Sequence, residues 1–129
     1  MIVIDASVGI DYLLNLNNQA RRIQARLQSD EVAVPHLFDV EVTQVMRRFV
    51  RAQDITLRRA HTAVLVLQDL PFLRYEHAHF LPRIFALRDV LTAYDAAYLA
   101  LAEALEATLL TRDAAFCRAP TRARVELWS

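Results

Sequence analysis

The hydrophobic positions of this chain alternate between short apolar runs and longer segments with helical spacing. The short runs cover residues 2–4, 32–34, 72–75, 108–110 and 125–128, and their β-branched and aromatic side chains are typical of strands. Between these runs, apolar side chains recur at the intervals expected of amphipathic helices. Strands that alternate with helices favour a parallel sheet covered on both faces. We therefore expect an α/β fold with three layers, α/β/α, around a short-stranded, mainly parallel central sheet.

Polar residues and prolines set the bounds of the expected helices. The pattern predicts helices after Asp5 to about residue 13, at 19–29, at 36–53, at 57–67, at 77–87 and from Thr92 to about residue 105, with a helical turn at 114–118. Pro82 is compatible with its helix only near the first turn, because proline has no amide hydrogen to donate. The helices at 36–53 and 57–67 form a hairpin whose apolar surface exceeds what one partner can cover. Most of that surface is expected to be core, and the surplus suggests dimerisation or docking of another protein.

Three of these helices have a clear expected buried face, and in the helix at 36–53 it consists of Phe38, Val42, Val45, Met46 and Phe49. In the helix at 57–67 it consists of Leu57, Ala60, Val64 and Leu67. In the helix that begins after Thr92 it consists of Tyr94, Ala97, Tyr98, Leu101 and Leu105. Thr56 and Thr92 are the expected N-caps of the latter two helices.

Length and composition narrow the class of protein. The chain has 129 residues, of which 55% are hydrophobic and 23% charged, so we expect one globular domain over residues 1–129. No apolar run reaches the roughly 20 residues of a membrane span, and the N-terminus lacks the features of a signal peptide. Cys117 is the one cysteine, which excludes an internal disulfide. A buried structural thiol in a cytoplasmic protein is the expected interpretation.

The charges are balanced, but their chemistry is distinctive. The formal net charge is zero, and all 15 lysine or arginine positions are arginine. The absence of lysine excludes chemistries that need one, such as a P-loop or a Schiff base. The four histidines are scattered along the chain and none is assigned to catalysis: His36, His61, His77 and His79. A group of arginines on the predicted hairpin could follow an RNA backbone or meet an acidic partner, although a solvated helix face explains it equally well: Arg47, Arg48, Arg51, Arg58 and Arg59.

Carboxylates stand where several predicted elements meet. Asp5 and Asp113 follow the apolar runs at 2–4 and 108–110. The carboxyl ends of parallel strands lie at one edge of a sheet, so these two side chains are expected at the same edge. Asp95 begins the helix that leads back to the second of these strands, which places its start at that edge too. Glu41 lies in the first turns after the strand at 32–34 and is expected nearby.

Each carboxylate taken singly also has a purely structural explanation. Asp5 and Asp113 can cap the segments that follow them. Asp95 completes a capping box with Thr92, at a helix start where negative charge is favoured. Glu41 can be an ordinary charge on the flank of its helix.

Together, four carboxylates at one edge would repel one another and raise the pKa of one or more of them. A hard divalent cation relieves that repulsion, and a set of oxygen donors without histidine or thiol favours Mg²⁺ or Mn²⁺ over Zn²⁺. Water on such an ion supplies a nucleophile, and the ion stabilises charge on a phosphate. The residues themselves therefore predict metal-dependent phosphate chemistry. Two alternatives stay open: a phosphatase with Asp5 as nucleophile, which would lack its usual lysine, and a non-catalytic RNA- or protein-binding domain on the same fold.

Four segments carry a resemblance to a known family: VIDASV, the segment from Pro35 to Arg48 with its Glu41, LTAYDAAYLALAE and LLTRDAAF. They resemble the four acidic motifs of PIN-domain ribonucleases, and the size and motif order are similar to the VapC-type toxins of bacterial type II toxin–antitoxin systems. The resemblance covers essentially the whole chain. It implies a PIN-like fold, an endoribonuclease that uses Mg²⁺ or Mn²⁺ to cleave single-stranded or looped RNA such as tRNA or rRNA, a homodimer, and a cognate antitoxin whose C-terminal segment fills the active-site groove.

The resemblance also assigns roles to individual residues. It gives catalysis and metal binding to four carboxylates, Asp5, Glu41, Asp95 and Asp113. Ser7 and Thr111 match small polar positions near the site, where they would support the carboxylates. Arg112, beside the last motif, could hold a phosphate with two hydrogen bonds. Asp39 and Asp89 compete with Glu41 and Asp95, but Asp39 projects to the opposite edge of its helix stripe, and Asp89 precedes the motif.

Overall fold

The computed structural model describes residues 1–16 and 18–128, so Asn17 and Ser129 lie outside the description. Its centre is a sheet of five strands in the order β3-β2-β1-β4-β5, with parallel pairing throughout. The strands are β1 (Ile2–Ile4), β2 (Val32–Pro35), β3 (Leu73–Tyr75), β4 (Thr108–Thr111) and β5 (Val125–Leu127). The predicted α/β class with a parallel central sheet is confirmed.

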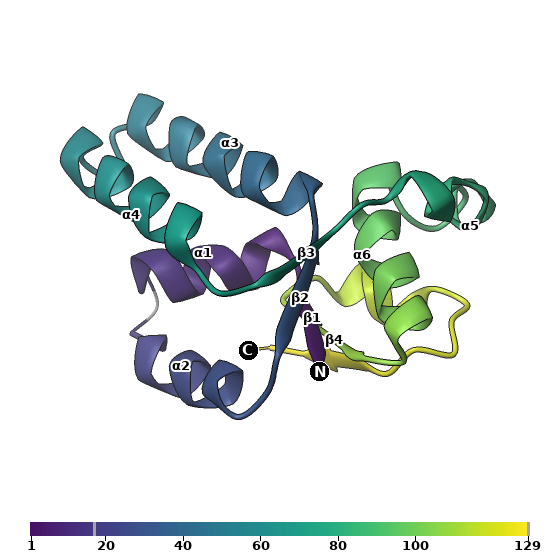
Figure 1. Ribbon diagram of the computed structural model, residues 1–129. Coiled ribbons are helices and arrows are strands. Elements are labelled where there is room, and N and C mark those ends of the chain that lie inside the picture. The colour runs from purple at the N-terminus through teal and green to yellow at the C-terminus, as the bar shows by residue number, and fades with distance from the viewer. Residues whose placement is uncertain (17, 129) are drawn as a thin grey trace.

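Helices cover both faces of this sheet. On one side lie α1 (Ala6–Leu14), α2 (Ala20–Gln28), α3 (Leu37–Arg51) and α4 (Leu57–Asp69), and on the other α5 (Leu81–Ala86) and α6 (Ala93–Leu105) (Figure 1). Two short 3-10 helices, η1 (Ala78–Phe80) and η2 (Ala114–Arg118), complete the chain. Figure 1 shows α3 and α4 side by side as the predicted hairpin. The three-layer arrangement is therefore as expected.

Side-chain caps fix where three of the helices begin. Asp5 accepts a hydrogen bond from the amide of Val8 at the start of α1. Thr56 and Thr92 cap α4 and α6 as predicted, and the Thr92 hydroxyl accepts from the amide of Asp95. Satisfying these otherwise unpaired amides stabilises each helix start. The caps also hold Asp5 and Asp95 in defined positions.

The segment predicted as one helix at 77–87 is divided. It consists of η1, with three residues, and α5, with six. Pro82 lies in the first turn of α5, where its missing amide hydrogen costs nothing. The helix therefore cannot extend further back through the proline, and the preceding residues form the tighter turn.

The core is continuous around the three central strands, but two expected core residues are exposed. Tyr94 is 67% exposed and Leu57 is 72% exposed. Both stand in the first turn of their helices and line surface hollows, Leu57 between α3 and α4 and Tyr94 between the starts of α1, α3 and α6. The start of α4 lies at the tip of the hairpin, away from the sheet (Figure 1). The predicted buried positions were therefore wrong for these two side chains.

Cys117 is exposed, so the prediction of a buried thiol was wrong. It lies in η2, whose buried side chain is Phe116. In this short 3-10 helix Phe116 is directed inward, and the neighbouring cysteine is left on the exposed side. None of the helices within residues 1–16 and 18–128 combines the length and hydrophobicity that a membrane span requires.

Candidate active site

Four carboxylates stand around the carboxyl edge of the central strands, each on a different element. Asp5 follows β1 and caps α1, and Asp113 follows β4 and caps η2. Asp95 lies in the first turn of α6, and Glu41 lies near the start of α3. Their charges act on one another: Asp113 and Asp5 act on Asp95, and Asp95 and Asp5 act on Glu41. The fold therefore brings all four predicted site carboxylates to one edge.

The pairing of β1 with β4 sets the centre of this group. Ile4 lies opposite Leu110, so the next residues, Asp5 and Thr111, also lie side by side. Only 5% of Asp5 is exposed. Its Oδ1 accepts from the Ser7 hydroxyl at 2.5 Å, and its Oδ2 accepts from the Thr111 hydroxyl at 2.5 Å. Burial raises the pKa of Asp5, and the hydrogen bonds from Ser7 and Thr111 offset only part of that rise.

The two hydroxyls also hold the loop that carries Asp113. The amide of Arg112 donates to Ser7 Oγ at 3.1 Å, and the amide of Asp113 donates to Thr111 Oγ1 at 3.0 Å. Each hydroxyl donates its one hydrogen to Asp5 and still accepts an amide hydrogen. Both oxygens of Asp5 are thus connected to the backbone that positions Asp113, which ties β1 and β4 together at the site.

Tyr98 is a further member of the site that we had assigned only to the core. Its hydroxyl donates to Glu41 Oε1 at 3.1 Å. Burial and the neighbouring Glu41 raise the pKa of Tyr98, so the phenol stays protonated and remains a donor. Burial also raises the pKa of Glu41, and the Tyr98 hydrogen bond lowers it in part. The signal in the sequence was the spacing: Tyr98 comes three residues after Asp95 and shares its helix face.

Arg112 has a partner that the sequence analysis did not consider. Its guanidinium donates to Asp11, which lies on α1 and is only 5% exposed. The ion pair fastens the Asp113 loop to α1 and partly neutralises Arg112, so a phosphate would have to share the guanidinium with Asp11. The signal was an acidic residue among the apolar positions of α1, because a buried carboxylate needs a partner.

The acidic residues that competed with Glu41 and Asp95 in the sequence, and the histidines, show no contact with the four carboxylates among the described interactions. Asp39 is held by Arg74 through two hydrogen bonds, at 2.6 and 3.0 Å, and Asp89 is exposed. All four histidines are exposed: His36, His61, His77 and His79. We assign none of these side chains to the site.

None of the four site carboxylates forms an ion pair within the described residues, although the charge of Arg48 acts on Glu41. The ion pairs there use other acidic side chains, namely Asp11, Asp30, Asp39, Glu103 and Glu126. Burial, together with the charges of Asp113 and Asp5, raises the pKa of Asp95. Within residues 1–16 and 18–128, no three histidine, cysteine or acidic side chains converge closely enough to hold a metal ion as they stand. Carboxylate oxygens that form no ion pair nevertheless fit a hard divalent cation that keeps several of its waters.

The metal-free protein is expected to gain stability as the pH falls from 7 to about 5. Burial raises the pKa values of Asp5, Glu41 and Asp95, so the folded state binds protons more tightly than the unfolded chain, and stability rises as these groups protonate. Asp30 and Glu103, whose pKa values are lowered, oppose this only below their ordinary values of 3.8 and 4.5. Thermal unfolding at several pH values in the presence of a chelator measures how the melting temperature changes with pH.

The Asp95→Asn variant is the matched comparison for this dependence of the melting temperature on pH. The variant should melt at a higher temperature than wild type at pH 7 and depend less on pH, because one repelled carboxylate is gone. Identical slopes for the two proteins would contradict the expectation.

Known proteins resemble this chain over most of its length. The sequence profile of the PIN domain matches residues 2–121. VapC ribonuclease Mb0985 of Mycobacterium bovis is 38% identical over 113 residues, which cover 88% of this chain and 86% of the relative. Ribonuclease VapC1 of Mycobacterium tuberculosis is 37% identical over 125 residues, covering 92% and 90% of the two chains. The chain therefore belongs to the PIN domain family and, within it, to the VapC proteins.

Solved structures show the same fold at low sequence identity. VapBC2 from Rickettsia felis, bound to a promoter DNA fragment, superposes with a TM-score of 0.73 and 14% identity over the whole of both chains. VapC20 from Mycobacterium tuberculosis gives a TM-score of 0.70 and 12% identity over 91% of this chain and 93% of that one. The PIN-like fold expected from the motifs is confirmed.

Proposed function

We propose that this protein is a Mg²⁺- or Mn²⁺-dependent endoribonuclease that acts in the cytoplasm as the toxin of a toxin–antitoxin pair. Residues 1–129 would act as one domain, and the substrate would be structured RNA such as tRNA or rRNA. The observation that carries the proposal is the meeting of four carboxylates at one edge of a PIN fold, three of them with raised pKa values. The relatives at 37% and 38% identity, which are named ribonucleases, support the reaction.

In this proposal Asp5, Asp95 and Asp113 hold the ion, while Glu41 orients the attacking water or holds a second ion. A bound ion supplies an activated water and stabilises the charge that develops on the phosphate. Mg²⁺ keeps several of its own waters, so carboxylates that do not converge for direct bonding can share it through water. Tyr98, which donates to Glu41, would fix the position of that carboxylate.

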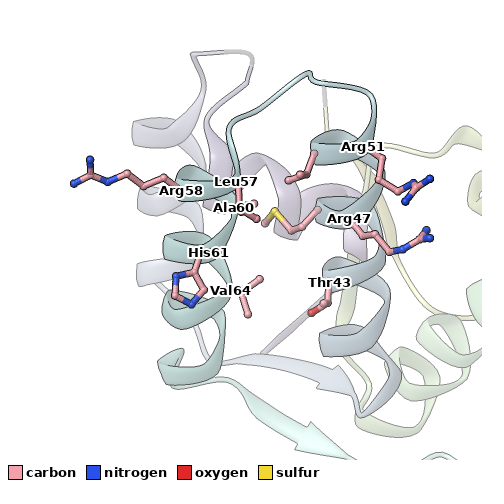
Figure 2. Close-up of a pocket in the computed structure, with 10 residues that line it drawn as sticks. Thr43, Arg47, Arg51, Leu57, Arg58, Ala60, His61 and Val64 are labelled. Atoms are coloured by element: carbon pink, nitrogen blue, oxygen red, sulfur yellow. The ribbon is translucent and has the colours of Figure 1, made fainter.

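We further propose a cognate antitoxin as the partner of the α3–α4 hairpin and a homodimer as a form of the protein. A groove of about 950 Å³ runs between the two helices. Figure 2 shows Leu57, Ala60 and Val64 at this groove, with Arg47 and Arg51 on the flank formed by α3. An apolar floor with a positive flank fits an amphipathic, acidic helix. The Rickettsia felis protein of the same fold was solved as VapBC2, which supports a partner protein for this chain. Light scattering of the protein alone and with its antitoxin measures both assemblies.

RNA cleavage tests the proposed activity directly. Purified protein is incubated with total RNA in Mg²⁺ or in EDTA, and the new 5′ ends are sequenced. We expect cleavage at a few defined sites in Mg²⁺ and none in EDTA. A folded protein that cleaves no RNA in Mg²⁺ or Mn²⁺ would instead favour a non-catalytic RNA- or protein-binding domain.

A further inference from the structure

Two large side chains face solvent directly beside the candidate site. Tyr94, 67% exposed, precedes Asp95 in the first turn of α6. Val40, 73% exposed, precedes Glu41 in α3. Single exposed apolar side chains are common on protein surfaces and need no explanation. Val40 and Tyr94 differ from such isolated side chains because both line the same cavity.

This cavity has a volume of about 570 Å³ and lies between the starts of α1, α3 and α6. Val40 and Tyr94 both line it, and so do Ala6, next to Asp5, and Glu41 itself. The helix starts meet there because all three helices begin at the carboxyl edge of the sheet (Figure 1). The cavity therefore borders the carboxylate site, with Glu41 in its wall and Asp5 and Asp95 next in sequence to the wall residues Ala6 and Tyr94.

The chemistry of the walls matches a nucleotide. The Tyr94 ring offers a flat face, and Val40 adds an aliphatic surface, which suits a stacked base. Gln44, which is exposed, presents both a donor and an acceptor to the edge of a base. Arg48 also lines the cavity, and its charge acts on Glu41. That cation suits the phosphate of a neighbouring nucleotide and offsets the repulsion between RNA and the four carboxylates.

We propose that this cavity binds one unpaired base of the RNA substrate, beside the phosphate that is cleaved, with Tyr94 stacked on the base. The proposal rests on the ribonuclease function above. A base inside a duplex has both faces stacked and offers none to Tyr94, so the cavity selects loops, bulges and single strands. Tyr94 and Gln44 then select which RNA is cleaved, while the carboxylates provide the catalysis.

Substitution of Tyr94 tests the base pocket. We expect Tyr94→Ala to weaken binding of a short random-sequence single-stranded RNA by about 10-fold or more, and Tyr94→Phe, which keeps the ring, to bind like wild type. Phe85→Ala is the matched control, since Phe85 is 69% exposed but lies on α5, outside the cavity. Fluorescence anisotropy in an Asp5→Asn background measures affinity without cleavage. In the cleaving protein, Tyr94→Ala should raise KM and change kcat little, because the stacking that is lost is equally strong in the ground state and the transition state.

The outcomes separate this proposal from the function it rests on. Equal RNA affinity of wild type and Tyr94→Ala, in a protein that does cleave RNA, overturns the base pocket alone. If Tyr94→Ala loses antitoxin binding but keeps RNA binding, the base pocket is overturned as well. The cavity would then bind a side chain of the antitoxin. A wild-type protein that cleaves no RNA in Mg²⁺ overturns both proposals. Wild-type affinity in Tyr94→Phe with loss in Tyr94→Ala supports the stacked base.

Discussion

Asp95→Asn is expected to lower kcat/KM for RNA cleavage by about 100-fold or more, since changes even to the outer partners of metal ligands cost 10–100-fold. The charges of Asp113 and Asp5 both act on Asp95, so the substitution removes one of the interacting charges of the group. The amide side chain has nearly the same shape, and the cap at the start of α6 uses the backbone amide of this residue, which is retained. The loss should therefore come from chemistry and not from unfolding.

Asp89→Asn is the control for that variant. Asp89 is exposed and precedes α6, so the same change of charge there should leave cleavage within about 3-fold of wild type. Cleavage rates are compared on the RNA identified by 5′-end sequencing, together with growth arrest on expression. Asp95→Asn that cleaves RNA and arrests growth as well as wild type does would contradict the assignment of the carboxylate group.

Gly9→Ala is expected to destabilise the protein by roughly 1–3 kcal/mol, the usual effect of overpacking a core. In an open helix position the same change would stabilise by about 1 kcal/mol. Here a Cβ on Gly9 would lie 2.6 Å from Cζ and 2.8 Å from Cε2 of Phe38, which is fully buried. The Phe38 ring packs against Phe72, with centroids 6.1 Å apart, so it cannot move aside freely.

This close contact also sets the distance between two parts of the site, because α1 begins after Asp5 and α3 carries Glu41. Urea unfolding of Gly9→Ala, Phe38→Leu and the double variant measures the coupling. The double variant should recover part of the sum of the two single losses, because the smaller side chain makes room for the new methyl group. Gly9→Ala with wild-type or higher stability would show that α1 and α3 separate without cost.

The sequence was sufficient to place the elements that end at the sheet edge. Apolar runs followed by Asp5 and Asp113 define two strand ends, and parallel pairing brings strand ends together whatever the side chains around them are. Thr92 and Thr56 were recognisable as caps because capping is local chemistry. The fold class, the hairpin and the arrangement of layers followed from these patterns.

The pattern of hydrophobic and polar positions does not predict which distant segments contact one another. Tyr98 and Glu41 are 57 residues apart, and Arg112 and Asp11 are 101 apart. Helical periodicity identifies a face but not how far the layer beneath it extends, which is why Tyr94 was assigned to the core. The prediction that Cys117 is buried was wrong for a related reason, since a 3-10 helix does not follow the period of an α-helix.

Titration calorimetry of Mn²⁺ binding to the purified protein at pH 7 tests the central claim most directly. That claim is that the four carboxylates form a metal site. We predict saturable binding to wild type, and binding weakened by about 10-fold or more in Asp5→Asn, whose carboxylate lies between Ser7 and Thr111 at the centre of the group. Folded wild-type protein that gives no binding heat, or Asp5→Asn that binds Mn²⁺ as tightly as wild type, would show that the four carboxylates do not form a metal site.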